Sequence, residues 1–337
     1  MAKRNTNTLQ SQSDTAIRIE RLVNAIQRTD SQAYRITYSK HGDEQISETR
    51  LSSYFDGIVQ MVALFEGDVV YQYNRHLSLF QEACQAIGVE RSPFGISCLS
   101  EDETRYLSTS ETLNELTKVI RTLLTQKRFK RREHDQRYQT TQQEIEVDHY
   151  VDAMFDRYAR VCVIRVDLYY RAEAQARLRA EHVFDDLDRL IAERERNPIF
   201  DRETGYICRV EQGEDRGYHI HTAFFFNGAE VCADIYRAQR IGELWERITR
   251  GRGCFHNCNL DKDKYRDRLG LGLVHRRDLK ARANVHHTMR YLVKNDQHLR
   301  LKPAGARCLR KGQARKVSGV TDRSIPDVPN SSVRLGC

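Results

Sequence analysis

Two apolar segments joined by a short polar turn constrain the fold of this chain more than any other feature. Residues 205–212 (GYICRVEQ) and 218–226 (YHIHTAFFF) are rich in β-branched and aromatic side chains, and residues 213–217 (GEDRG) separate them. This pattern predicts two antiparallel strands that form a β-hairpin. We therefore expect the second half of the chain to be built around an antiparallel sheet.

The segments around the hairpin complete an α+β pattern. Residues 161–169 (VCVIRVDLY) predict a further buried strand, and residues 271–275 predict a short one. Apolar residues at helical spacing predict helices over residues 172–196, 234–249 and 283–294. The order β-α-β-β-α-β-α suggests an antiparallel sheet with helices on one face, which we assign to a domain of residues 146–305.

The first half of the chain predicts a mostly helical domain, residues 15–145. Amphipathic patterns in it predict helices over residues 17–26, 51–65, 73–87 and 110–126. The basic run 127–132 (KRFKRR) and the glutamine-rich residues after it predict a linker at the end of this domain. Residues 1–14 are polar and predict a disordered leader, and residues 306–337 predict a basic, partly disordered tail.

The composition fits a cytoplasmic protein. The 55 Lys and Arg exceed the 47 Asp and Glu, which suits a polyanionic partner, although a basic solvated surface explains the excess equally well. The sequence has no run of about 18 apolar residues, so no membrane span is expected. The polar start lacks the apolar core of a signal peptide, and nine scattered cysteines argue against a secreted disulfide framework.

The densest cluster of cysteines is a weak candidate for a zinc site. Cys254, His256 and Cys258 offer three ligands within five positions, but ligands this close can hardly all reach one tetrahedral ion. No second Cys/His pair follows at zinc-finger spacing. We therefore interpret this stretch as a polar loop.

The second strand of the hairpin carries a candidate metal site. Side chains alternate along a strand, so His219 and His221 share one face, with attachment points about 7 Å apart. A turn centred on Asp215 pairs residues whose numbers sum to 430, which puts Glu211 opposite His219 with about 5 Å between Cβ atoms. Two imidazoles and a carboxylate suit Mn²⁺ or Mg²⁺, and zinc would bind them too. A purely structural role for the two histidines is the alternative.

Tyr291 and Lys294 are the candidates for nucleophilic chemistry. They are three positions apart in a predicted helix and so share a face. A phenol is a poor nucleophile at its usual pKa of about 10, but a metal ion on the same phosphate makes the phosphorus easier to attack. Lys294 can stabilise the phenolate or hold the phosphate. Because the chain has 16 tyrosines, this pair is informative only together with the metal ligands.

These residues together resemble the motifs of the HUH endonuclease superfamily. The matching residues, in the expected chain order, are Glu211, His219, His221, Tyr291 and Lys294. The stretches GYHIH and RYLVKNDQ look most like the replication proteins of inoviruses (filamentous phages), also called YagK/YfjJ-like. The resemblance covers about residues 145–305 and implies a palm-like or RRM-like HUH domain.

The resemblance implies a replication initiator of a rolling-circle phage or prophage element. Such an enzyme nicks single-stranded DNA at an origin, stays joined to the 5′ phosphate, and leaves a 3′ end for polymerase. A single nucleophile is expected, because position 295 is Asn and no second tyrosine follows one turn later. Contact with the host replication machinery is left open. The cations Lys280, Arg282 and Arg290 are expected to neutralise DNA phosphates.

Two other classes of function compete with this interpretation. A non-catalytic DNA-binding regulator agrees with the basic balance and the helical first half. A cupin-type metalloenzyme shares the spacing of Gly213 and the two histidines, but Phe225 and Phe226 stand where its glutamate is needed. The long predicted helices also disfavour an all-β cupin fold.

Overall fold

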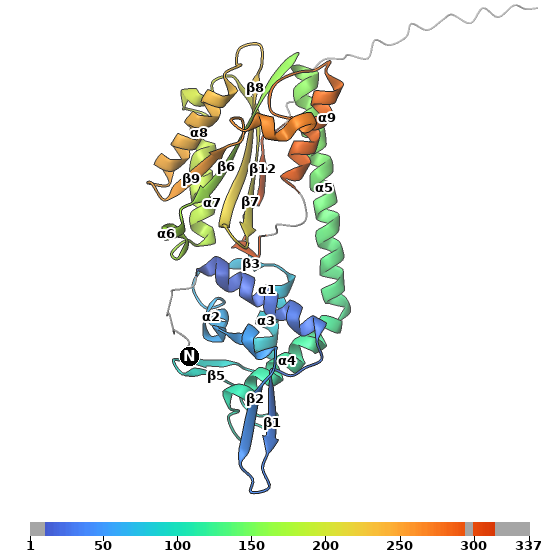
Figure 1. Ribbon diagram of the computed structural model, residues 1–337, viewed down its shortest axis with the longest axis vertical. Coiled ribbons are helices and arrows are strands. Elements are labelled where there is room, and N and C mark those ends of the chain that lie inside the picture. Colours follow the sequence, from blue (N-terminus) through green and yellow to red (C-terminus); the bar gives the residue numbers. More distant parts are fainter. Residues whose placement is uncertain (1–10, 294–298, 314–337) are drawn as a thin grey trace, which may run out of the picture.

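The computed structural model describes residues 11–293 and 299–313. An N-terminal, mostly helical part and a sheet-containing part lie end to end, and one long helix runs beside both (Figure 1). The predicted α+β class, with an antiparallel sheet after a mostly helical region, is confirmed. Over the described residues, no helix combines the length and the apolar character needed to span a membrane.

The N-terminal part is built from four α-helices, a short 3-10 helix and five short strands. The helices are α1 (Gln12–Arg28), η1 (Ser52–Phe55), α2 (Ile58–Ala63), α3 (Arg75–Ala86) and α4 (Thr109–Thr125). The strands are β1 (Tyr34–Tyr38), β2 (Glu44–Glu48), β3 (Tyr71–Tyr73), β4 (Glu90–Ser92) and β5 (Gly95–Ser97). Their apolar stripes are buried, as the sequence predicted, but they do not form the core of a separate domain. They share one continuous core with one face of the main sheet, which includes Ile164 and Phe224.

Two local features explain how this part departs from the predicted helices. The helix expected over residues 51–65 is broken at Gly57, whose φ of 79° lies in the left-handed region. The strands β1 and β2 were not predicted, because the hairpin they form projects into solvent and has no buried face to impose an alternating pattern. By contrast, a capping box at Ser108 and Glu111 begins α4 close to where the sequence placed it.

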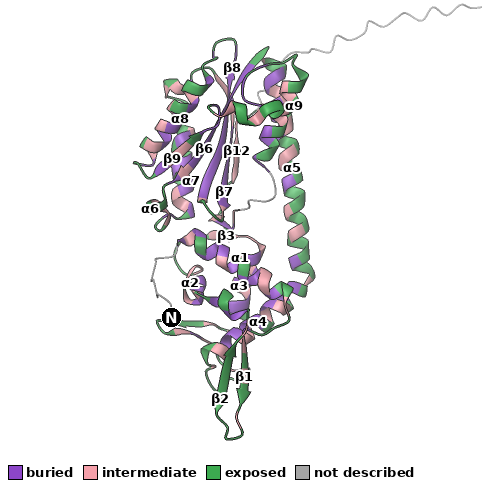
Figure 2. Ribbon diagram, viewed as in Figure 1, coloured by how far each residue is buried: buried purple, intermediate pink, exposed green. Residues whose placement is uncertain are grey.

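The long helix α5 (Lys127–Arg157) corrects the prediction of a linker. The basic and glutamine-rich residues are helical without a break, and the boundary expected near residue 145 lies inside this helix. Its first half is largely exposed (Figure 2), so it has no apolar stripe that could reveal a helix. Only its C-terminal half packs on the sheet, through Val147, Val151 and Phe155 among others.

The main sheet has six strands, and all their pairings are antiparallel. They are β6 (Arg160–Tyr170), β7 (Glu203–Gly213), β8 (Gly217–Asn227), β9 (Gly253–Asn257), β10 (Gly272–His275) and β12 (Leu309–Lys311). The order is β10-β6-β8-β7-β12, with β9 also beside β6. Part of the predicted tail is therefore ordered, because β12 pairs with β7. Just before the tail, β11 (Leu301–Pro303) pairs with β3.

Helices cover both faces of this sheet, whereas the sequence predicted helices on only one face. Besides α5, the helices of this part are α6 (Ala172–Gln175), α7 (Ala180–Glu193), η2 (Pro198–Phe200), α8 (Asp234–Ile248), η3 (Lys262–Arg268) and α9 (Leu279–Tyr291). Ile220 and Phe224 of β8 belong to the same core as α7 and α8, whereas Ala223 and Phe225 pack with α5 and α9. Because α5 was taken for a linker, its apolar end was not recognised as a cover for the second face. The helix expected over residues 172–196 is divided into α6 and α7.

A buried polar network joins the two parts of the molecule. Gln212, at the end of β7, donates from Nε2 to Oγ of Ser13 at 3.0 Å and accepts from the backbone N–H of Arg300 at 3.0 Å. Arg300 also donates to Oε2 of Glu20 at 2.5 Å, and the other oxygen of Glu20 lies 3.1 Å from Nδ1 of His76. Burial alone would raise the pKa of Glu20, but His76 and Arg300 lower it to about 2.

This network predicts a stability that depends on pH. A carboxyl whose pKa is about 2 in the folded state, against its ordinary value of 4.5, stabilises the fold above pH 4.5, and this contribution is lost as the pH falls towards 2. We expect Glu20→Gln to lower the free energy of unfolding in urea by about 1.5–3 kcal/mol at pH 6. The difference from the wild type should shrink by more than half at pH 3. An equal difference at both pH values would contradict this role.

Candidate metal centre

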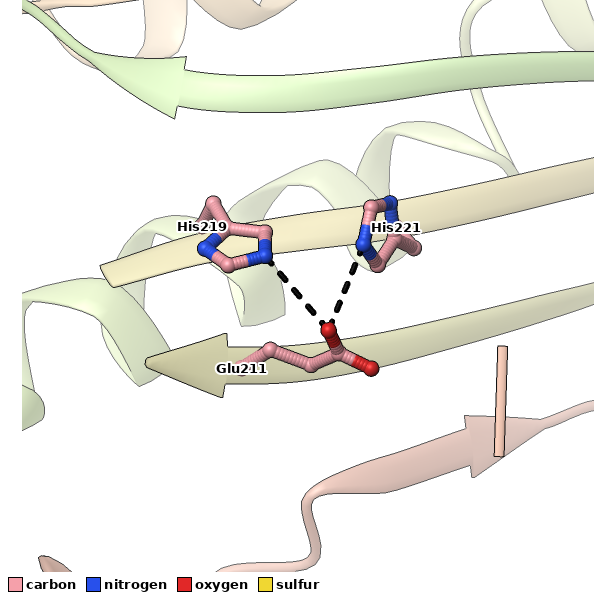
Figure 3. A group of neighbouring side chains, drawn as sticks. All are labelled: Glu211, His219 and His221. Carbon is pink, nitrogen blue, oxygen red and sulfur yellow. Dashed lines mark ion pairs between the residues drawn. The ribbon is translucent and has the colours of Figure 1, made fainter. Parts of the chain in front are cut away.

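The hairpin of β7 and β8 brings the three predicted ligands together. Glu211 pairs with His219 and Arg209 pairs with His221, so the register predicted from a turn at Asp215 is confirmed. Oε2 of Glu211 lies 3.4 Å from Nε2 of His219 and 3.3 Å from Nε2 of His221 (Figure 3). All three side chains are buried, and their ligand atoms lie within 4.8 Å of one another.

This donor set fits a divalent metal ion. Ligand atoms at about 2.1 Å from an ion, at angles of about 90–110°, lie about 3.0–3.4 Å from each other. The Glu211 oxygen has this spacing from both imidazole nitrogens. Three protein ligands leave coordination positions for water or a substrate oxygen. Glu211, His219 and His221 can therefore hold a metal ion.

Contacts at the other ring nitrogens hold both imidazoles in the orientation that a metal ion needs. Nδ1 of His221 lies 2.7 Å from Oδ1 of Asp167, and Nδ1 of His219 lies 3.1 Å from the carbonyl oxygen of Gly217. Because these oxygens only accept, each Nδ1 carries the hydrogen and Nε2 is left to bind an ion. The Tyr169 ring also stacks on that of His219, with centroids 5.9 Å apart.

Asp167 and Arg165 are site residues that the sequence analysis missed. Both lie on β6, on the face that carries the histidines, and both are buried. Nε of Arg165 donates to Oδ1 of Asp167 at 3.2 Å. The sequence held a signal for them: Arg165 and Asp167 are the two charged residues in the otherwise apolar segment 161–169. Charges in a buried strand need partners, which marks them as candidates for a site.

The charges around the ligands keep the carboxylates ionised. Burial alone would raise the pKa of Glu211, but hydrogen bonds from His219 and His221 bring it below its ordinary value. Burial would also raise the pKa of Asp167, and His221 and Arg165 lower it well below its usual range. Burial would lower the pKa of His221, yet its bonds to Asp167 and Glu211 raise it to about 9. A metal ion must therefore displace a proton from His221 at neutral pH.

Tyr291 ends α9 over the same face of the sheet. The guanidinium carbon of Arg165 lies 5.7 Å from the centroid of the Tyr291 ring, and Nη2 of Arg165 lies 3.5 Å from Nδ1 of His221. Arg165 thus lies beside both the phenol ring and a predicted metal ligand, although its Nη2 and the Nδ1–H of His221 are both donors. Tyr291 is 48% exposed, so its ring remains accessible from solvent. Lys294, the second predicted catalytic residue, lies outside the described residues.

The three cations predicted to bind DNA have different surroundings. Arg290 pairs with Asp148 at 2.6 Å and Arg282 pairs with Asp152 at 3.0 Å, so both join α9 to α5. Lys280, at the start of α9, lies 3.4 Å from Asp267, and its side chain is 75% exposed. In this structure Arg282 and Arg290 contribute to helix packing, whereas Lys280 points to the surface.

The Cys254 cluster does not form a second metal site. Cys254 and His256 lie in β9 rather than in the expected loop, and Nε2 of His256 pairs with Asp261 at 3.1 Å. Cys258 is buried just after the strand. Within residues 11–293 and 299–313, no other group of His, Cys, Asp and Glu side chains has the spacing of metal ligands.

The N-terminal part directly supports the hairpin that carries the three candidate ligands. Tyr218, next to His219, donates its hydroxyl to Oε1 of Gln12 at 3.1 Å, and the same oxygen accepts the backbone N–H of Ala180 at 2.8 Å. Gln212, next to Glu211, is held by Ser13. Helix α1 therefore contacts both strands at the positions beside their ligands, a role that the sequence did not reveal.

The fold and site define an α+β protein with a candidate divalent-metal centre on an antiparallel sheet. Residues 106–252 match the sequence model of the YagK/YfjJ C-terminal domain family. The match includes Asp167, Glu211, His219 and His221, begins before α4, and ends before Tyr291. No curated protein and no solved structure matches the chain.

Metal binding should release a proton. Because the pKa of His221 is raised to about 9, Mn²⁺ binding at pH 7 should displace about one proton. The affinity should rise as the pH increases from 6 towards 9. Calorimetry in buffers of different ionisation enthalpy measures both quantities. His219→Ala and His221→Ala should abolish binding, whereas His41→Ala, in the exposed β1–β2 turn, should leave it unchanged. A pH-independent affinity would count against His221 as a ligand.

Asp167 should act on metal affinity through His221. Loss of a partner that orients a ligand typically weakens metal binding about 10–100-fold. We expect Asp167→Asn to have this effect on the Mn²⁺ dissociation constant while the circular dichroism spectrum is retained. Asp186→Asn is a matched control, because Asp186 is also a buried carboxylate and accepts the hydroxyl of Tyr170 at 3.1 Å beside the other core. Equal losses in the two variants would indicate a general effect of buried charge.

Proposed function

We propose that this protein nicks and joins single-stranded DNA, with Tyr291 as the nucleophile and a metal ion held by Glu211, His219 and His221. It would then act as a single-tyrosine HUH endonuclease that initiates rolling-circle replication of a phage or prophage element. The observation that carries the proposal is a buried Glu-His-His set and an accessible phenol on one face of the sheet, with Arg165 beside both.

The proposed reaction exchanges one phosphoester bond for another. The Tyr291 oxygen forms a bond to phosphorus, the bond from phosphorus to the 3′ oxygen breaks, and the 5′ phosphate stays on the tyrosine. The phenol loses its proton to solvent, and the leaving 3′ oxygen gains one. Attack by a free 3′ hydroxyl reverses the step and joins the strand. The reaction needs no external energy source, because the phosphotyrosine bond conserves the bond energy of the phosphodiester.

The residues around Tyr291 suit this step. A divalent ion, Mg²⁺ or Mn²⁺, would polarise the phosphoryl oxygen and favour attack by a phenol. Arg165 lies beside the Tyr291 ring and can stabilise negative charge that develops there. Lys294 follows Tyr291 by three positions, and the resemblance to HUH enzymes assigns it a similar role. The match of the metal-binding hairpin to the YagK/YfjJ domain supports the same proposal.

A non-catalytic DNA-binding regulator is the second candidate. One observation favours it: the family match ends at residue 252, so the proposed nucleophile lies beyond the matched region. A regulator would use the metal centre, if at all, to stabilise the hairpin. It would bind DNA without forming a covalent bond.

A covalent-adduct assay tests the proposal. The full-length protein is incubated with Mn²⁺ and 3′-labelled single-stranded oligonucleotides that tile the DNA around its gene, and adducts are detected on a denaturing gel. We expect Tyr291→Phe to lose the adducts but to keep oligonucleotide binding. EDTA and His219→Ala should also remove them. Tyr236→Phe is the control, because Tyr236 is 66% exposed on α8 and belongs to the other side of the sheet.

The outcomes separate the two candidates. Adducts that persist in Tyr291→Phe would show that another group is the nucleophile. Adducts that form equally well in EDTA would exclude a metal-dependent step. Sequence-specific binding by the wild type with no adduct under any metal would favour the regulator.

A further inference from the structure

A polar groove with a volume of about 1130 Å³ lies between α5 and the C-terminal strands. Its α5 wall carries Gln136, Gln139 and Gln143, whose spacing of three and four residues places them on one helical face. The facing wall belongs to residues 299–313, and Tyr206, Arg209 and Val210 of β7 form its floor. Figure 1 shows the bordering elements α5, β7 and β12.

The groove reaches the candidate metal centre through Arg209. Arg209 lies opposite His221 in the hairpin, and its Nε lies 3.4 Å from Oε1 of Glu211. Its Nη1 donates to Oε1 of Gln143 at 3.0 Å, across to α5. The side chain of Arg209 is only 6% exposed. A molecule that fills the groove would therefore reach Arg209, which lies next to the candidate metal ligand Glu211.

The charges of the groove suit a polyanion. Its lining includes five cations, Arg209, Lys302, Arg307, Arg310 and Lys311, against one acidic residue, Glu146. Arg310 pairs with Asp188 and Lys311 pairs with Glu146. Nζ of Lys302 donates to the carbonyl oxygen of Ala306 at 2.6 Å. For Lys302 and Arg307, no carboxylate of the described residues lies within ion-pairing distance. These two cations can bind anionic groups of a ligand without breaking an ion pair.

The size and the glutamines point to a nucleic acid strand. At about 1130 Å³ the groove is as large as the largest small-molecule pockets, which occupy about 300–1,000 Å³, so it has room for more than one unit of a polymer. Glutamine amides both donate and accept, as base edges do, and these edges are open in an unpaired strand. Proteins that bind single strands combine a cationic groove with aromatic side chains on which bases stack, and the lining of this groove includes the aromatic residue Tyr206.

We propose that this groove holds the DNA single strand that leads to the metal centre, with phosphates along Lys302 and Arg307 and bases against the glutamines of α5. The choice of DNA as the polymer rests on the proposed function. The groove itself does not depend on nicking, because it lies beside the metal ligands and not among them.

Equilibrium binding in EDTA tests the groove apart from catalysis. The probe is a fluorescein-labelled single-stranded 20-mer of mixed sequence, added to the full-length protein. We expect Lys302→Glu/Arg307→Glu to bind at least tenfold more weakly. The slope of log affinity against log salt should also fall by roughly 1.4, or about 0.7 for each lost phosphate contact. The control Arg35→Glu/Lys40→Glu makes the same charge change at exposed positions of the β1–β2 hairpin, and its affinity should stay within twofold.

Photo-crosslinking gives a second measurement that does not require a charge change. The crosslinking residue p-benzoyl-phenylalanine at position 139, in the α5 wall, should crosslink to the 20-mer in EDTA. The same residue at position 37, in β1, should not. Crosslinking at position 139 that a tenfold excess of unlabelled 20-mer does not compete would be non-specific and would contradict the proposal.

The possible results distinguish a failure of the groove proposal from a failure of the nicking proposal. Wild-type binding that the Lys302/Arg307 variant retains, with no crosslink at position 139, would overturn the groove and leave the nicking proposal intact. Groove-dependent binding without any covalent adduct would support the groove and contradict nicking. If polyglutamate binds as tightly as the 20-mer and is lost in the same variant, an acidic peptide is the better ligand and the proposal is wrong. Absence of wild-type binding would also overturn it.

Discussion

The candidate site depends on the register of the β7–β8 hairpin. Glu211 meets His219 only because the turn at residues 214–216 pairs Gly213 with Gly217. A slip of one residue would move Glu211 to the opposite face of the sheet and separate it from both histidines. Both faces of the hairpin are buried, since Phe224 packs in one core and Phe225 in the other, so a slip would also expose or misplace large aromatic side chains. The same packing that stabilises the sheet therefore holds the ligands together.

The N-terminal part and α5 give the hairpin its surroundings. Gln12 and Ser13 of α1 hold Tyr218 and Gln212, each of which is the neighbour of a predicted ligand. On the other side, Gln143 of α5 holds Arg209, which contacts Glu211. The first half of the chain is thus part of the support of the site. The family match over residues 106–252 includes α4 and α5 but not α1.

The sequence predicted elements well where an apolar pattern marked one buried face. The strands β6, β7 and β8 and the helices α4 and α8 agree with the predicted segments to within a few residues. Helix α1 begins at Gln12, five positions before its predicted start, so the end of the predicted disordered leader is helical. The helix α5 was missed because its exposed half carries glutamine and charge all round, and β12 was missed because an edge strand of three residues has no period to read. Because α5 was missed, the sequence predicted helices on only one face of the sheet, whereas α5 and α9 cover the second face.

By itself, the sequence determined the α+β class, the hairpin and its three candidate ligands, because the contacts of Glu211 with His219 and His221 span only eight and ten positions and follow from the geometry of two neighbouring strands. Only the tertiary structure decided which groups surround them. Asp167 reaches His221 across 54 positions, and Gln143 reaches Arg209 across 66. Arg165 meets the ring of Tyr291 from a different element altogether. Strand alternation and helical spacing operate within one element or one hairpin, whereas contacts between distant segments arise from how whole faces pack together.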